Sequence, residues 1–163
     1  MKKGITVQPF IFILALVVMA FVITFGTKSI FDLKKTAEFT ELGLFIDKLN
    51  DEVEKFENYE VGSYSNVLFV TPLKVKSICF ANIGEPITGA APDSLIRSAI
   101  EGGSRSNVYI LPIGVFPKTD FYIERLRVKE SANPLCINTK GRLDAALETA
   151  LHNGQVYVEI HRK

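Results

Sequence analysis

Few residues in this sequence have side chains that could do chemistry, and the two cysteines come first. Cys79 lies in the run LKVKSICF and Cys136 in the run PLCIN, and both runs have the apolar composition of strands. In an oxidising space such a pair is a candidate disulfide, whereas two buried free thiols are the alternative. We expect the disulfide, which by closing a loop of this length would stabilise the fold by about 4 kcal/mol.

Metal binding and catalysis are not expected. The sequence has no C-x-x-C pair, and His152 and His161 lie toward opposite ends of an expected hairpin. The motifs G-x-S-x-G, G-x-x-x-x-G-K-[ST], H-E-x-x-H and G-x-G-x-x-G do not occur either. Gly102 and Gly103 follow a predicted helix, whereas the glycines of a phosphate loop precede one. We therefore predict no catalytic, cofactor-binding or metal site, no evident small-molecule substrate and no enzyme activity.

The charge balance argues against a nucleic-acid partner. The formal net charge of the 163 residues is +1, and charged residues make up 23% of the chain. No strong field therefore exists to attract a polyanion. The hydrophobic fraction of 47% is enough for one packed core in the part of the chain outside the membrane.

A long uncharged segment near the N-terminus predicts a membrane anchor. Residues 5–26 carry no charge, and a helix of that length spans about 30 Å of hydrocarbon at roughly 1.5 Å per residue. A cleavable secretory signal is the alternative, but its apolar stretch normally has only about 7 to 15 residues. We predict a transmembrane segment over residues 1–27, with the lipid bilayer as its partner.

The orientation of this anchor does not follow from charge, because lysines lie on both sides of the apolar segment. The expected disulfide decides it, since disulfides persist in oxidising spaces. We predict a single-pass protein of the cell membrane whose C-terminal domain is extracytoplasmic.

The next segment, residues 28–60, predicts an amphipathic helix close to the membrane. Six apolar residues follow a 3-4-3-4-3 spacing that places them on one stripe of the helix: Phe39, Leu42, Ile46, Leu49, Val53 and Phe56. We expect the protein's own β-rich domain to cover this stripe. A parallel coiled coil between identical subunits is the alternative, and either arrangement makes the stripe an interaction surface.

Residues 61–163 predict an antiparallel β-rich domain, either a sandwich or an open sheet, with one short helix. The helix is expected at 94–101, between an Asp93 cap and Gly102. Residues 143–151 fit a helix and a strand equally well, and we favour a strand that ends at the Asn153-Gly154 turn. The other strands are expected at 66–70, 73–80, 107–111, 121–128, 135–138 and 155–161. The first two of these should form a hairpin, and the fold class is α+β.

The first seven residues, MKKGITV, resemble the class III signal of type IV pilin-like proteins, which is short and basic with a glycine before a long apolar helix. In that family a dedicated peptidase cuts after the glycine, and the helix then both spans the membrane and forms the filament core. The resemblance implies a processing site between Gly4 and Ile5. The acidic residue that many pilins carry five positions after the cut is Pro9 here. This departure from the family pattern argues against filament assembly. At the N-terminus itself we expect an intact anchor rather than cleavage after Gly4.

Four short pieces further along the chain, GSYS, ICF, LPIG and PLCIN, are similar to pieces of uncharacterised archaeal single-pass membrane proteins. The function of that group is not known, so this resemblance implies only a topology and an archaeal source.

The expected function is that of a membrane-anchored structural or interaction protein of the cell envelope, either a pilin-like or an accessory filament subunit. Self-association through the N-terminal helix, or binding of other proteins there, would follow. The alternative is a membrane-anchored receptor or scaffold subunit that binds a soluble partner through the 81–106 loop.

Overall fold

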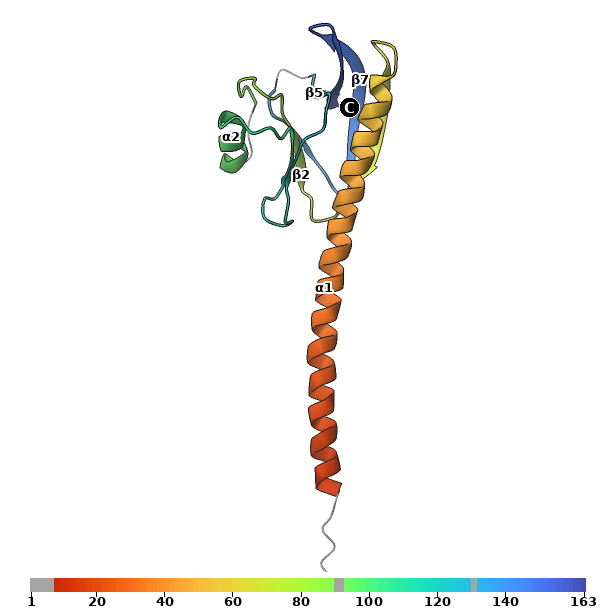
Figure 1. Ribbon diagram of the computed structural model, residues 1–163, viewed down its shortest axis with the longest axis vertical. Coiled ribbons are helices and arrows are strands. Elements are labelled where there is room, and N and C mark those ends of the chain that lie inside the picture. Colours follow the sequence, from red (N-terminus) through yellow and green to blue (C-terminus); the bar gives the residue numbers. More distant parts are fainter. Residues whose placement is uncertain (1–7, 90–92, 130–131) are drawn as a thin grey trace, which may run out of the picture. The chain divides into compact units, whose positions relative to one another are not determined.

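The computed structural model describes residues 8–89, 93–129 and 132–163, and Figure 1 shows the course of the chain. One long helix precedes a set of strands that a short helix interrupts, which confirms the predicted α+β class. The helices are α1 (Gln8–Glu57) and α2 (Ser94–Glu101). The strands are β1 (Tyr64–Val70), β2 (Ser77–Phe80), β3 (Val108–Leu111), β4 (Asp120–Phe121), β5 (Leu126–Val128), β6 (Leu135–Asn138), β7 (Arg142–His152) and β8 (Gln155–Arg162).

The chain divides into two compact units, Met1–Thr40 and Glu41–Lys163. In its described part, the first unit is the N-terminal portion of α1. All side chains of residues 10–37 are exposed, and the most apolar window has a mean hydropathy of 2.7 with no buried residue. By length and composition this helix is able to cross a membrane.

The second unit has one main hydrophobic core, to which the end of α1 contributes. Leu42, Phe45, Leu49, Val53 and Phe56 are all buried there. Because they follow a three- or four-residue spacing, they lie on one face of the helix. The rest of the core comes from strands of both sheets and from the connections between them. The last turns of α1 therefore belong to the folded domain.

The first sheet has the strand order β1-β7-β8-β5. β1 with β7 and β7 with β8 are antiparallel, whereas β5 with β8 is parallel. Along β7, Leu143, Ala145 and Leu147 alternate onto the core face, opposite the outward-facing Asp144 and Glu148. Residues 143–151 are thus part of a strand, as favoured from the sequence.

The second sheet has the order β4-β3-β2-β6, and every neighbouring pair in it is antiparallel. One face carries Ile78 and Ile110 into the main core, and the other carries Cys79 and Tyr109 into a smaller cluster with Ile96 of α2. Helix α2 therefore covers the outer face of this sheet, as Figure 1 shows beside β2.

Two local predictions are confirmed at residue level. Helix α2 begins after Asp93, whose side chain accepts a hydrogen bond from the Leu95 N–H at 2.8 Å, and Gly102 is its C-cap. The β7–β8 turn is Asn153-Gly154, with φ of 52° and 78°. Two successive positive φ values are what a type I′ hairpin turn requires.

The expected hairpin between strands 66–70 and 73–80 is wrong. β1 pairs with β7 in the first sheet, and β2 pairs with β3 and β6 in the second. A turn closed by the Val75 N–H on the Pro72 carbonyl (2.9 Å) replaces the first half of the expected second strand. The chain therefore changes sheets here instead of folding back.

The expected single strand at 121–128 is also wrong, because it is divided between the sheets as β4 and β5. Arg125 has a φ of 61°, a left-handed conformation that a continuous strand does not contain. The buried side chain of Asn107 holds this break. Its Oδ1 accepts from the Ile123 N–H (2.8 Å), and its Nδ2 donates to the carbonyls of Ile123 (2.7 Å) and Leu126 (3.2 Å).

Candidate functional site

The two cysteines form a disulfide between neighbouring strands, which confirms the pairing expected from the sequence. Cys79 of β2 lies directly opposite Cys136 of β6, with the Cα atoms 3.9 Å apart. The Thr139 N–H donates to the Lys76 carbonyl at 2.8 Å, so the cysteines fall on a non-hydrogen-bonded pair, where opposite residues approach most closely. Cys79 is fully buried under α2. The bridge therefore links two neighbouring strands of the second sheet inside the smaller hydrophobic cluster.

The apolar stripe of α1 lies mostly inside the core of the domain. Leu42, Leu49, Val53 and Phe56 are buried, and Ile46 is partly buried against the same core. Phe39 is 47% exposed and belongs to the other unit.

Phe45 is a core residue outside the predicted stripe. Its ring meets that of Phe69 edge to face at a centroid distance of 5.9 Å. Its spacing of three and four residues from Leu42 and Leu49 could have identified it.

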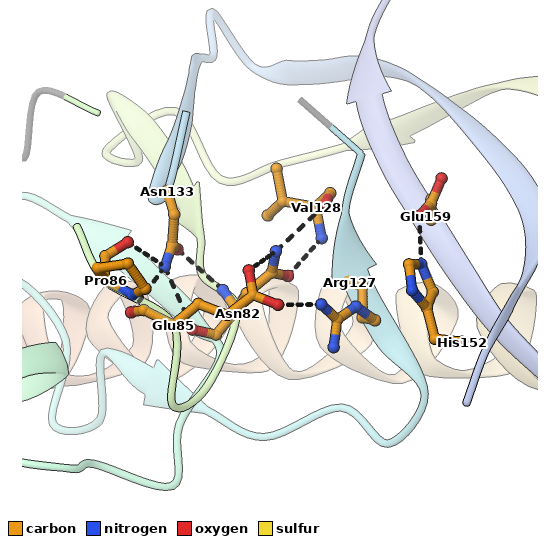
Figure 2. A network of polar contacts seen from close by, with 8 residues as sticks. All are labelled: Asn82, Glu85, Pro86, Arg127, Val128, Asn133, His152 and Glu159. Carbon is orange, nitrogen blue, oxygen red and sulfur yellow. Dashed lines mark hydrogen bonds and ion pairs between the residues drawn. The ribbon is translucent and has the colours of Figure 1, made fainter. Parts of the chain in front are cut away.

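The start of the 81–106 connection is fastened to the domain by side-chain amides (Figure 2). The Asn82 N–H donates to Asn133 Oδ1 (2.9 Å), and Asn82 Oδ1 accepts from the Val128 N–H (2.8 Å). Asn133 Nδ2 donates to the carbonyls of Glu85 and Pro86, both at 3.2 Å. An ion pair between Glu85 and Arg127 adds to these contacts, so this segment has a defined conformation.

The outer face of the first sheet carries a cluster of charged and aromatic residues. Glu148 and Glu159 lie directly opposite each other, and each has a cationic or imidazole neighbour. Lys129 pairs with Glu148, and His152 Nε2 lies 2.7 Å from Glu159 Oε1, the latter drawn in Figure 2. The hydrogen bond to Glu148 raises the pKa of Lys129. This network balances two adjacent carboxylates that would otherwise repel each other.

The side chain of His161, near the end of β8, is mostly shielded from solvent. Its side chain is only 19% exposed and its Nε2 lies 3.9 Å from Glu148 Oε2. Its ring packs beside that of Tyr64 at a centroid distance of 5.7 Å. In the described ranges no group of three or more histidine, cysteine, aspartate or glutamate side chains could hold a metal ion.

A groove runs between α1 and the open edge of β1, and the sequence had not indicated it. Its apolar end is a cavity of about 350 Å³ whose walls include Leu44, Phe45, Val70, Pro72 and Leu73. Its polar end is a cavity of about 520 Å³ between Lys48, Asp51, Glu52 and Lys55 of α1 and residues 65–69 of the strand. Lys48 lines both cavities, so we treat them as one feature, the α1–β1 groove.

The candidate processing site at Gly4 and Ile5 lies outside the described residues. The cleavage expectation therefore stays a prediction from the sequence.

No family model matches this chain, and no curated protein or solved structure matches it either.

Proposed function

We propose that this chain is a non-catalytic, single-pass membrane protein of the cell envelope whose folded domain is extracytoplasmic. One observation carries the proposal: an apolar helix whose side chains from Phe10 to Phe25 are all exposed precedes a domain that a disulfide cross-links. Water disfavours so much exposed apolar surface, and a bilayer removes that cost. The disulfide favours an oxidising space for the domain.

Two cysteine variants test the orientation, one at each end of the chain. Lys163→Cys places a thiol on the exposed C-terminus of the domain, and Lys3→Cys places one before the apolar helix. With an impermeant maleimide on intact cells we expect labelling of the first variant only. The second should react once the membrane is breached. Labelling of Lys3→Cys in intact cells, with Lys163→Cys protected, would show the opposite topology.

We further propose that the chain acts as a pilin-like or accessory filament subunit that associates through its N-terminal helix. The helix also exposes apolar side chains after its uncharged segment, where charged residues are interspersed. Each of them is about two-thirds exposed: Ile30, Phe31 and Leu33. Ile30, Leu33 and Ala37 lie on one face of the helix by their spacing. A second helix packed along this face would remove their apolar surface from water.

Oxidative cross-linking in membranes tests this association. Ile30→Cys should give a dimer under mild oxidation, whereas Asp32→Cys, on a different face of the same turn, should not. If neither variant gives a dimer, helix self-association is wrong.

Mass spectrometry of the native protein identifies its first residue, which distinguishes a plain anchor, an anchor processed in the pilin manner, and a secreted protein. A chain that begins at Met1 or Lys2 supports the plain anchor that we expect, and one that begins at Ile5 supports processing of the pilin type. A start near Thr27 would mean secretion and would overturn the anchor.

A receptor or scaffold role for the 81–106 connection is the second candidate. Ile83 and Leu95 are exposed apolar residues on a connection whose beginning is held by hydrogen bonds. Deleting the connection would also remove Ile96 from over the disulfide, so point variants are the cleaner test. Leu95→Asp should abolish recovery of a partner from native membranes, while Ser98→Ala should not. Equal recovery with both variants would refute this role.

A further inference from the structure

The open edge of β1 differs from the other sheet edges of this domain. β4, β5 and β6, which end the sheets elsewhere, have two, three and four residues. β1 has seven residues, YSNVLFV, without a charge or a proline. Proteins normally protect an edge strand by making it short, charged, bulged or covered, because its free backbone groups pair with other chains. β1 has none of the first three protections.

The register of the sheet identifies which backbone groups of β1 face this edge. The Thr149 N–H donates to the Ser63 carbonyl (2.9 Å), and the Thr71 N–H donates to the Gly141 carbonyl (3.0 Å). Hydrogen-bonded pairs with β7 therefore fall on odd-numbered residues of the strand. The N–H and C=O groups of the even-numbered residues point outward: Tyr64, Asn66, Leu68 and Val70. Within the described ranges they have no backbone partner, and only the Asn66 carbonyl has a side-chain donor, Ser65 Oγ at 3.4 Å.

The α1–β1 groove lies along this edge, between α1 and residues 65–73. Its apolar end, beside Leu44, Val70 and Leu73, fits one large apolar side chain, and these three residues are between 55% and 87% exposed.

The charges of the groove indicate what such a chain would carry. Two lysines, Lys48 and Lys55, face three carboxylates, Glu41, Asp51 and Glu52, and Glu52 is already paired with Lys55. Because the resulting net charge of −1 is small, a charged segment would gain little from this wall, and an uncharged segment fits it best.

We propose that the open edge of β1 is a binding site for an extended, uncharged segment of a partner protein. The segment adds to the first sheet as a strand beside β1 and places one large apolar side chain between Leu44 and Leu73. Backbone hydrogen bonds to residues 64–70 supply affinity, and the apolar end sets the register. This site extends the proposed role as an anchored interaction protein by naming the chemistry of the partner.

The test is selection from a displayed library of short peptides against the full chain in lipid nanodiscs. Leu68→Pro removes one edge-facing N–H and leaves the ladder to β7 intact, because proline is tolerated on the open side of an edge strand. Leu68→Thr is the matched control that keeps this N–H. We expect selected peptides to be uncharged and to bind Leu68→Pro about five- to tenfold more weakly than Leu68→Thr, the loss that one hydrogen bond produces.

Amide hydrogen exchange then locates the bound peptide. Saturating peptide should slow exchange of the Asn66 and Leu68 amides, and N-methylation of those peptide amides that face β1 should abolish binding.

Selection that yields no binder, or binders indifferent to Leu68→Pro, would overturn the proposal. A concentration-dependent dimer that already protects these amides would also overturn it, in favour of a second copy of the chain. The labelling of Lys163→Cys is independent of all these results, so failure of the anchor and failure of the edge site are distinguishable.

Discussion

Cys79 and Cys136 are direct cross-strand neighbours, 57 residues apart in sequence, at the one place where β2 and β6 bring two cysteines opposite each other. The bridge joins the second strand of the domain to the sixth. It lies on the face of the second sheet that α2 covers, away from the main core.

Removing this bridge should therefore lower stability without changing the fold. We expect Cys79→Ala with Cys136→Ala to reduce the free energy of unfolding by about 4 kcal/mol, because the unfolded chain regains loop entropy. Urea unfolding of the full chain in detergent, followed by far-ultraviolet circular dichroism, measures this change. The wild-type protein with reductant should lose a similar amount, and an unchanged midpoint would contradict the expectation.

Asn82 should be as important for stability as a core side chain. Its side chain bonds both backbone groups of Val128, so Asn82→Ala leaves buried groups unpaired and should cost about 1–3 kcal/mol. Asn66→Ala, at an exposed position of β1, is the matched control and should change stability by less than about 0.5 kcal/mol. Equal effects of the two variants in urea titrations would show that the Asn82 network contributes nothing.

Two leucines of α1 should respond very differently to truncation. Leu49 is fully buried in the domain core and Leu44 is 55% exposed. We expect Leu49→Ala to cost about 2–5 kcal/mol, the range for a large core side chain, and Leu44→Ala to have little effect. The loss should appear in the unfolding of the β-rich domain, because this part of α1 belongs to its core. A loss of helical signal alone would contradict that assignment.

Tyr109 should make the protein less stable at high pH. Burial is the largest cause that raises its pKa above the ordinary value of 10.0 in the folded state, with a smaller contribution from Asp120. The unfolded state therefore releases this proton first, and the stability it contributes is lost as pH rises above the unfolded value. In urea titrations between about pH 9 and pH 11, the midpoint of the wild type should fall relative to that of Tyr109→Phe as pH rises. A constant difference would show that Tyr109 does not titrate differently on folding.

Replacing Gly154 of the β7–β8 turn with alanine should lower stability more than the same replacement at Gly43 of α1. It has a φ of 78°, and a Cβ there would meet no atom within 4 Å, so any cost is conformational. Gly154→Ala should lower stability by about 1 kcal/mol. Gly43→Ala, which replaces a helical glycine of α1 with open space around it, should be neutral or stabilising. Thermal unfolding of both variants separates the cost of a side chain at a positive φ from the general effect of adding a Cβ.

Local signals in the sequence were sufficient wherever a structure depends on neighbouring residues. Helix α2 follows from Asp93, an apolar spacing and Gly102, and the β7–β8 hairpin follows from Asn153-Gly154 between two alternating runs. The long α1 helix follows from the uncharged apolar run 5–26 and from the apolar spacing within residues 28–60. In each case the residues that determine the element lie within a few positions of it.

Pairings between distant segments could not be read in this way. The apolar runs around Val67 and Ile78 looked like the arms of a hairpin, but their partners are β7 and the strands β3 and β6. The run 121–128 looked continuous, but it breaks because the distant Asn107 side chain bonds the backbone at Ile123 and Leu126. The sequence does not show which distant backbone groups the side chain of such a polar residue will hydrogen-bond.

The sequence by itself determined the apolar N-terminal helix, the α+β class, the short helix and the expectation that two cysteines pair. These depend on composition, periodicity and turn chemistry, which are local. Only the tertiary structure decided that the domain core, the expected partner, covers the end of α1. It alone also showed that β1 is an open edge beside an apolar cavity. Which strand ends a sheet depends on long-range pairing, and that is set by how all the apolar faces are buried together.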